Sequence, residues 1–370
     1  MIETTVRLRD AAEPVRKLAA DFATTGEHER QLDKRVIDAI IEAGFARHFV
    51  PAQWGGSAGT FTDATDAVSL VGEGCASAAW VASVFAYSGR FASFLPEQAQ
   101  SDIWADGPDH VVASALVPSG SAIAADGGWR ISGDWHYISG AATSDWALVS
   151  GPLQSNMPPR FFVVPRTDFT VIDSWNSTGM RATMSNTLRI EDVFVPEYRS
   201  VQRSVLIDGL QDTTLPASQR APLRAAGGLA FAAPILGAAA GALAGTVRHN
   251  AARAGTRQPA AEARLNVGLT HASGELAAAQ LLLAGVAAAC DQGHFGRQER
   301  AVHGRDAAVA ANLAVTAVGR LMQLCGTAGF DEHSSVQRHW RDVNCAVSHH
   351  AVQLDAAAAA FGPMLLDQAR

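Results

Sequence analysis

Hydrophobic and polar residues alternate in three different ways along the chain. Up to about residue 105, apolar residues recur every three or four positions, as in VIDAIIEAGFARHFV, which is typical of amphipathic helices. Between about 110 and 200 the apolar runs are short, rich in β-branched and aromatic residues, and separated by turns such as PSGS and DGG, which predicts an antiparallel barrel or sandwich. Beyond this region the pattern is helical again and predicts a bundle of four Ala-rich helices, at 216–254, 262–292, 303–328 and 335–366.

These three patterns predict a mostly helical α+β fold. We expect an N-terminal helical domain over 1–108, a middle β-domain over 109–205 and a C-terminal four-helix bundle over 206–370. A helix–β–helix order in one chain indicates a composite site where the three parts meet. The stretch GGLAFAAPILGAAAGALAG is long enough to raise the question of a membrane span, but its Ala and Gly content and Pro234 favour a helix buried in the bundle.

Composition narrows the range of partners. The 370 residues carry a net charge of -7 and no cluster of Lys and Arg, which disfavours nucleic acid. Four cysteines lie far apart without a CxxC pair, which indicates reduced thiols and no metal site. The N-terminal sequence MIETTVRLRDAAEPVRKLAADF is charged and amphipathic and contains no signal-peptide core, so we expect a cytoplasmic protein.

Several segments, in the right order, resemble the acyl-CoA dehydrogenase superfamily. They are EAGFARHFVPAQWGG, WRISGDWHYISGAATSDWALVSG, RIEDVFVP and QLCGTAGFDEHSSVQRHWRDV. The likeness covers almost the whole chain and implies the fold of this family. Its dehydrogenases need a carboxylate base, which by resemblance lies close to a double histidine that here reads SHHA. The alternative position, on the first bundle helix, is also empty because no Glu occurs between Glu197 and Glu262. Dehydrogenation is therefore disfavoured.

The flavin-dependent monooxygenases on this fold match better. CASAAWV, WNSTGMRATMSNTLRI and QRHWRDVNCAVSHH resemble motifs of the oxygenase component of 4-hydroxyphenylacetate hydroxylase and its relatives. The resemblance implies a two-component (group D) enzyme in which reduced FAD or FMN and O2 give a C4a-hydroperoxyflavin that hydroxylates an aromatic, polycyclic or indolic small molecule. Because no GxGxxG opens a βαβ unit, a separate NAD(P)H:flavin reductase has to supply the reduced flavin. An N- or S-oxygenase, a dehydrogenase with another base and a flavin-free scaffold are the alternatives.

The resemblance also implies catalytic side chains. Ser139 in HYISG occupies the position of a Ser or Thr that hydrogen-bonds flavin N5, and Tyr137 is expected on the same strand face. A histidine, with a pKa near 6.5, suits a group that takes the ring proton of the substrate and orients it. On one continuous helix His349 shares a polar stripe with Asp342, whereas His350 falls on an apolar stripe, and family spacing also favours His349. Without the resemblance, Ser139 is a turn residue and each histidine a surface or core residue.

For the flavin, the resemblance implies contacts from the segment VASALVPSGSA, from the strand of Ser139 and from the late Gly-rich turn. The candidates are Ser114, Leu116, Val117, Ser121, Tyr137, Ser139, Arg181, Thr183, Gly326, Thr327 and Gly329. A surface ion pair with Glu191 or Asp192 is the alternative for Arg181. The turn reads CGTAG where dehydrogenases show a double Gly, so FAD and FMN both stay open.

The sequence further suggests a substrate pocket and an assembly. The apolar pocket is expected to be aromatic, formed by Trp80, Phe85, Tyr87 and Trp175. Small-residue faces of the bundle, together with the habit of the fold, indicate a homotetramer or at least a dimer.

Overall fold

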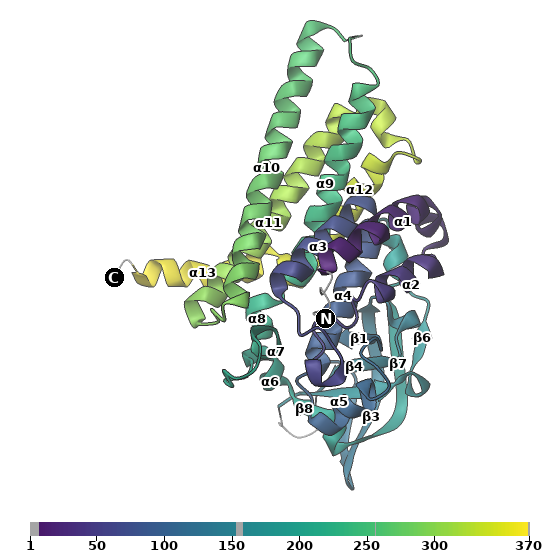
Figure 1. Ribbon diagram of the computed structural model, residues 1–370, viewed down its shortest axis with the longest axis vertical. Helices are drawn as coiled ribbons and strands as arrows, with labels where there is room; N and C mark the ends of the chain where they lie inside the picture. Colours follow the sequence, from purple (N-terminus) through teal and green to yellow (C-terminus); the bar gives the residue numbers. More distant parts are fainter. Residues whose placement is uncertain (1–6, 153–157, 256, 369–370) are drawn as a thin grey trace, which may run out of the picture.

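The N-terminal part of the chain consists of packed helices. The computed structural model describes residues 7–152, 158–255 and 257–368, and it begins with α1 (Leu8–Glu29), α2 (Lys34–Glu42), α3 (Phe61–Gly74), α4 (Ala76–Ala92) and α5 (Glu97–Trp104) (Figure 1). Asp33 and Thr60 begin α2 and α3 by accepting hydrogen bonds from backbone N–H groups of the first turn. Every residue of α4 except Val84 is buried, so α4 is the central element of this part.

The middle part is a sandwich of two four-stranded sheets. Its strands are β1 (Val112–Ala115), β2 (Ser121–Ala125), β3 (Gly128–Ile138), β4 (Trp146–Gly151), β5 (Arg160–Pro165), β6 (Thr170–Ile172), β7 (Asn186–Pro196) and β8 (Ser200–Gln202), in the orders β1-β4-β5-β8 and β2-β3-β7-β6. Trp135 and Phe162 belong to the apolar core between the sheets. The predicted sandwich is confirmed with one difference. β1 and β4 pair in parallel, because the chain passes through the other sheet between them.

The C-terminal part is a helical bundle that stands above the β-domain (Figure 1). Its helices are α6 (Arg203–Asp208), α7 (Ala217–Arg220), α8 (Leu223–Ala226), α9 (Leu229–Ala251), α10 (Pro259–Asp291), α11 (Arg297–Leu324), α12 (Ser335–Ala346) and α13 (Leu354–Gln368). The α9 helix packs against α3, α4, α10, α11 and α12, as predicted for its apolar sequence. Gly237 of α9 crosses Gly72 of α3 so closely that a Cβ on Gly72 would lie 2.9 Å from the Gly237 Cα.

The prediction of one continuous helix over 335–366 is wrong. The α12 helix ends at Ala346, the 3-10 helix η7 (His350–Val352) follows, and α13 leaves the bundle in a new direction (Figure 1). Side chains hold the break, because the Ala351 amide donates to His349 Nδ1 (3.2 Å) and Gln353 donates to the Ser348 carbonyl oxygen (2.9 Å). The polar stripe expected for His349 on a continuous helix is therefore absent.

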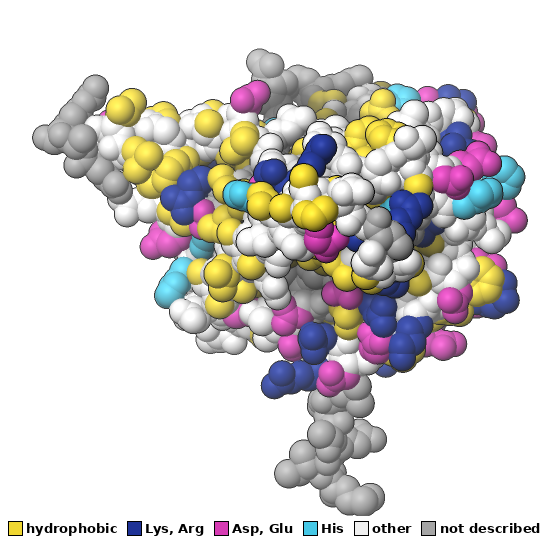
Figure 2. All heavy atoms as spheres, turned by 90° about the horizontal axis from the view of Figure 1, so that it is seen from above, with side chains coloured by type: hydrophobic (Ala, Val, Ile, Leu, Met, Phe, Trp, Pro, Cys, Tyr) yellow, Lys and Arg dark blue, Asp and Glu magenta, His cyan; other side chains and the backbone are white. Residues whose placement is uncertain are grey.

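Apolar side chains remain uncovered on two of the C-terminal helices. By length and composition, three helical segments of the described chain could cross a membrane: Leu223–Ala251, α10 and α11. Of the apolar window in the first, 72% is buried in the fold, but only 33% of that in α10. Leu281 of α10 is 74% exposed, and Leu366 of α13 is 68% exposed. Figure 2 shows hydrophobic side chains along the arm that α13 forms.

Candidate functional site

Ser139 lies at the head of a hydrogen-bonded chain of hydroxyl groups. Trp80 Nε1 donates to Ser139 Oγ (3.0 Å), and the chain runs on to Ser185 (2.7 Å) and Thr183 (2.7 Å), whose Oγ1 donates to the Met180 carbonyl oxygen (2.9 Å). Because a carbonyl only accepts, each hydroxyl must donate toward Met180. Ser139 therefore uses its proton within the protein and keeps an oxygen lone pair for a ligand.

The end of β3 is bent so that its side chains no longer alternate. The pairing with β7 shifts register between Trp135 and Ile138, and Tyr137 adopts a positive φ of 65°. The Tyr137 side chain is consequently 76% exposed, whereas Ser139 is buried. The expectation that both residues lie on one strand face is thus wrong, and the bulge is the reason.

His349 contributes its imidazole to the same place as Ser139. The ring stacks on Phe231 of α9, with centroids 3.7 Å apart and planes at 24°, and meets Trp80 edge-on at 5.6 Å. Trp80 thereby connects the two predicted catalytic residues. Phe231 was not predicted, although it is the one Phe, Tyr or Trp in the sequence of α9.

The surroundings of His349 keep its imidazole neutral at pH 7. Burial, with a smaller contribution from His350, lowers the pKa of His349 to about 4. Since Nδ1 accepts the Ala351 amide, the neutral ring carries its proton on Nε2. In this state His349 is a hydrogen-bond donor to a ligand. To take a proton, as the sequence suggested, the ring must first give up the bond to Ala351.

His350 lies in a different environment from His349. Its side chain is exposed and lines an open hollow of about 920 Å³ between α11 and α13. Arg224, Arg297 and Arg300 line the same hollow, and none of the residues around Ser139 does. The structure therefore separates the two adjacent histidines, and only His349 joins the Ser139 group.

Four predicted flavin contacts come shortly after the start of β1. Ser114 and Leu116 are half-buried, Val117 is 75% exposed, and Ser121 is half-buried in β2, within the other sheet. Ser119 Oγ donates to the backbone of β3 (2.8 Å), which ties this segment to the strand that precedes Ser139. Val117 thus offers an uncovered apolar side chain.

Arg181 carries an unsatisfied polar atom. Its Nε is buried without a hydrogen-bond partner, and the nearest carboxylate oxygen is that of Glu27, at 3.9 Å. The alternative for Arg181, a surface ion pair with Glu191 or Asp192, is not formed, and Asp192 pairs with Arg130 instead (2.8 Å). A buried guanidinium nitrogen without a partner is costly unless a ligand supplies an acceptor.

An aromatic surface made by the exposed Tyr137 and the half-buried Trp175 fits a flavin. Tyr137 and Trp175 meet edge-on, with ring centroids 6.1 Å apart, and Trp175 Nε1 donates to the Met180 carbonyl oxygen beside Arg181. Uncovered aromatic faces suit a flat ring system, and a guanidinium suits its phosphate or carbonyl oxygens. These residues and the lone pair of Ser139 form a consistent set for the isoalloxazine and its tail.

The late Gly-rich turn lies apart from this surface. Gly326, Thr327 and Gly329 form η6 (Gly326–Phe330) at the end of α11, and this end of the bundle stands away from the β-domain in Figure 1. Among the described residues, no hydrogen bond or ring contact joins it to the Ser139 group. Within one chain, the structure does not bring these predicted flavin contacts together.

The predicted aromatic pocket is also divided. Trp80 contacts His349, whereas Phe85 packs under the turn after Ser139 in another part of the core. Tyr87 lies about two turns beyond Trp80 on α4, in the core that includes Phe61. Trp175 is half-buried and belongs to the aromatic surface described above. Trp80 contacts both Ser139 and His349, whereas Phe85 lies against the turn that follows Ser139.

Asp342 of α12 positions the segment that ends the hydroxyl chain. Its buried carboxylate accepts the Met180 amide (2.6 Å). Met180 and Met184 both have a positive φ, at 53° and 50°, which is strained for residues with side chains and needs support from the surroundings. Burial raises the pKa of Asp342 to about 6, despite the hydrogen bond from Met180 that lowers it.

We expect Asp342→Asn to change the pH dependence of stability. Because the folded pKa is raised, the stability that Asp342 contributes is present below about pH 4 and is lost as pH rises through about 6. A shift of two units corresponds to about 3 kcal/mol. Denaturant unfolding from pH 4 to 7 should show the variant gaining about this much relative to the wild type, and the exposed Asp355→Asn should follow the wild type. If the free energies of unfolding of Asp342→Asn and the wild type changed in parallel with pH, the raised pKa of Asp342 would be contradicted.

Comparisons with known proteins identify the fold and the class of protein. Residues 229–354 match the model of the acyl-CoA dehydrogenase C-terminal domain family. The chain is 29% identical to the flavin-dependent monooxygenase oxygenase subunit HsaA of Mycobacterium tuberculosis, covering 92% of this chain and 91% of that protein. It is also 29% identical to the FADH2-dependent resorcinol hydroxylase oxygenase component of a Rhizobium species, covering 98% and 94%.

A solved structure gives the same result for the fold. XiaF from Streptomyces, in complex with FADH2 and glycerol, superposes with a TM-score of 0.91 at 27% identity, covering 97% of this chain and 95% of that chain. All of these full-length matches include the N-terminal helices and the β-domain as well as the bundle. The similarity is therefore one of the overall fold and of the class of protein.

Proposed function

We propose that this chain, an acyl-CoA dehydrogenase-fold flavin-dependent monooxygenase, is an oxygenase component that hydroxylates an aromatic small molecule at the Ser139–His349 site. The observation that carries the proposal is the meeting of the Ser139 acceptor oxygen and the neutral imidazole of His349 at Trp80. A separate reductase delivers reduced FAD or FMN, which Val117, Tyr137, Trp175 and Arg181 would hold beside Ser139. HsaA and the resorcinol hydroxylase, both named as oxygenase components, support this division of labour.

Reduced flavin supplies the electrons with which O2 is activated for insertion of one oxygen atom into the substrate. The lone pair of Ser139 accepts a hydrogen bond from a flavin N–H, such as N5–H of the reduced form. The Nε2–H of His349 donates to a phenolic or carbonyl oxygen of the substrate and so fixes the ring that is to be hydroxylated. Phe231 and Trp80 pack around the imidazole and exclude water from it.

The orientation of the hydroxyl chain predicts a preference for one redox state of the flavin. N5 of oxidised flavin is a hydrogen-bond acceptor and cannot bond to the Ser139 lone pair, which is also an acceptor. N5–H of reduced flavin is a donor and can bond to that lone pair. Anaerobic titration should therefore give a dissociation constant at least about tenfold lower for reduced than for oxidised flavin, since an unmet buried polar contact costs about 1–3 kcal/mol. Equal affinities would contradict the assigned orientation. Aerobic turnover with a reductase, assayed on phenols and indoles, tests hydroxylation directly.

Assembly of several copies is part of the proposal. Large apolar residues are exposed on α10 and α13, among them Val267 at 59% and Leu281 at 74% exposure, and exposed apolar surface is typical of interfaces between subunits. A second copy packed on these helices supports a homodimer or homotetramer. Four cysteines without disulfides are in keeping with a cytoplasmic location.

A further inference from the structure

Arg90 is a buried cation without an anion. Its side chain is fully buried on α4, where Nε donates to the Ser218 carbonyl oxygen (2.6 Å) and another nitrogen donates to the Ala221 carbonyl oxygen. The guanidinium lies over the rings of Phe61 and Phe94, at 5.2 and 5.3 Å. No carboxylate among the described residues pairs with it, and its third nitrogen has no hydrogen-bond partner. A charge in this position is costly unless something compensates it.

Two other polar atoms near Arg90 also lack partners. The hydroxyl of Tyr87, one helical turn before Arg90, is buried and unpaired, and so is the hydroxyl of Ser218, whose carbonyl Arg90 binds. Burial lowers the pKa of Arg90 to about 10, which leaves it charged at neutral pH. One region therefore offers two hydroxyls and a cation, each with free hydrogen-bonding capacity.

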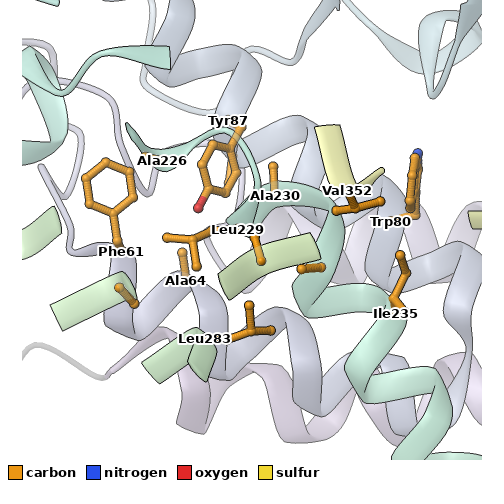
Figure 3. Close-up of a cluster of buried hydrophobic side chains, with 14 of the residues drawn as sticks. Phe61, Ala64, Trp80, Tyr87, Ala226, Leu229, Ala230, Ile235, Leu283 and Val352 are labelled. Atoms are coloured by element: carbon orange, nitrogen blue, oxygen red, sulfur yellow. The ribbon is translucent and has the colours of Figure 1, made fainter. Parts of the chain in front are cut away.

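Tyr87 lies on the same face of α4 as Trp80 of the proposed reaction site, and Arg90 projects about 80° further round the helix. Trp80 and Tyr87 are seven residues apart, which is two turns, so they project on one side about 10 Å from each other, with Arg90 about 15 Å from Trp80 along the axis. Figure 3 shows Tyr87 and Trp80 at the two ends of an apolar row in which Ala230 and Val352 lie between them. The intervening side chains are small or aliphatic, and they are buried.

We propose that Arg90, Tyr87 and Ser218 form a distal subsite for an anionic oxygen group, such as a carboxylate, at the far end of an elongated aromatic substrate. The inference rests on the proposed function, because it places the reacting ring beside His349. The substrate class is then an aromatic compound with an acidic group about 10–15 Å from the hydroxylated ring, a span taken from the helix geometry. The small and aliphatic side chains of the row match the apolar middle of such a molecule, which would have to move them apart to bind.

Binding of a matched series of probes tests the subsite. The probes are ω-(4-hydroxyphenyl)alkanoic acids with two to eight chain carbons and their methyl esters, which have similar length but no charge. Calorimetry is done with the chain alone and, without oxygen, with its reduced-FAD complex. At the chain length that reaches Arg90, the acid should bind at least about tenfold more tightly than its ester, as expected for hydrogen bonds to a charged group. Equal binding of acid and ester at every length would overturn the proposal.

Two substitutions separate ligand binding from folding. Arg90→Gln should reduce the ratio of acid to ester affinity to about one and leave ester binding unchanged. Tyr87→Phe removes only an unpaired hydroxyl, so the melting temperature should stay the same or rise while acid affinity falls about fivefold or more. Tyr198→Phe is the matched control, because its hydroxyl already donates to Asp102 (3.0 Å) at the surface, and it should keep the ratio. A ratio that survives in both Arg90→Gln and Tyr87→Phe overturns the subsite.

The two proposals fail in distinguishable ways. Suppose that the acids bind more tightly than the esters and that Arg90→Gln removes this difference, but no probe is hydroxylated. The subsite is then supported and the proposed reaction is contradicted. If the esters are hydroxylated as efficiently as the acids, the reaction is supported and the subsite is contradicted. Should Arg90→Gln not fold, Tyr87→Phe and Ser218→Ala carry the test, with the same expected loss of acid preference.

Discussion

We expect His349→Ala to lower the yield of hydroxylated product per O2 consumed by about a hundredfold, while flavin is still oxidised and hydrogen peroxide accumulates. The imidazole is the hydrogen-bond donor at the meeting point of Trp80 and Phe231, and positioned groups of this kind contribute about 10²–10⁴ in rate. Its removal leaves the substrate oxygen without its partner and opens the space to water. Product and peroxide, quantified in the same reaction with a saturating reductase, give the yield.

His350→Ala is the matched control for this experiment. The two histidines are adjacent in sequence, but His350 faces the open hollow between α11 and α13. Its replacement should leave the product yield within about twofold of the wild type. A loss of yield in His350→Ala that equals the loss in His349→Ala would contradict the placement of the imidazoles. His349→Asn, which keeps a side-chain N–H donor, should recover part of the yield.

We expect Ser139→Ala to weaken binding of reduced flavin about tenfold and to destabilise the fold by about 1–3 kcal/mol. The substitution removes the acceptor for the flavin N–H and leaves the buried indole N–H of Trp80 without a partner. Anaerobic titration measures the first effect and denaturant unfolding the second. Product yield should fall together with flavin affinity.

Ser185→Ala distinguishes the role of the Ser139 oxygen from that of its proton. In this variant Ser139 keeps the hydrogen bond from Trp80 but loses the hydroxyl to which it donates. The proton of Ser139 is then free to turn toward oxidised N5. The ratio of the dissociation constants for oxidised and reduced flavin should therefore decrease, although reduced flavin still binds. If Ser185→Ala widened the preference, the direction assigned to the hydroxyl chain would be wrong.

The general architecture was predictable from hydrophobic periodicity. Helical spacing, short β-branched runs and Ala-rich stretches each determine an element type, and the order of motifs pointed to the acyl-CoA dehydrogenase-like fold and to its monooxygenases, both of which are confirmed. The predicted flavin-dependent chemistry and aromatic class of substrate agree with the relatives as well. These predictions depend on long patterns, which tolerate local irregularities.

The details of the site were less predictable because they depend on backbone breaks. Helical spacing before His349 and an Ala-rich sequence after it both favour helix, so nothing in the propensities marks the turn that orients the imidazole. The bulge that turns Tyr137 outward is similarly invisible to simple alternation. Asp342 was predicted only as a member of a helical stripe, whereas its carboxylate holds a strained segment of the β-domain. Arg90 was not singled out, since only three-dimensional packing reveals that it lacks a counter-ion.

The break between α12 and α13 also affects how this chain can tolerate change in length. Because a turn rather than a continuous helix orients His349, an extra residue inserted within α13 would rotate the outer part of that arm by about 100° without turning the imidazole. The same insertion between Ala346 and His349 would rotate or displace the ring away from Phe231. The C-terminal arm formed by α13 can therefore vary in length and sequence among homologues while the reaction site keeps its geometry.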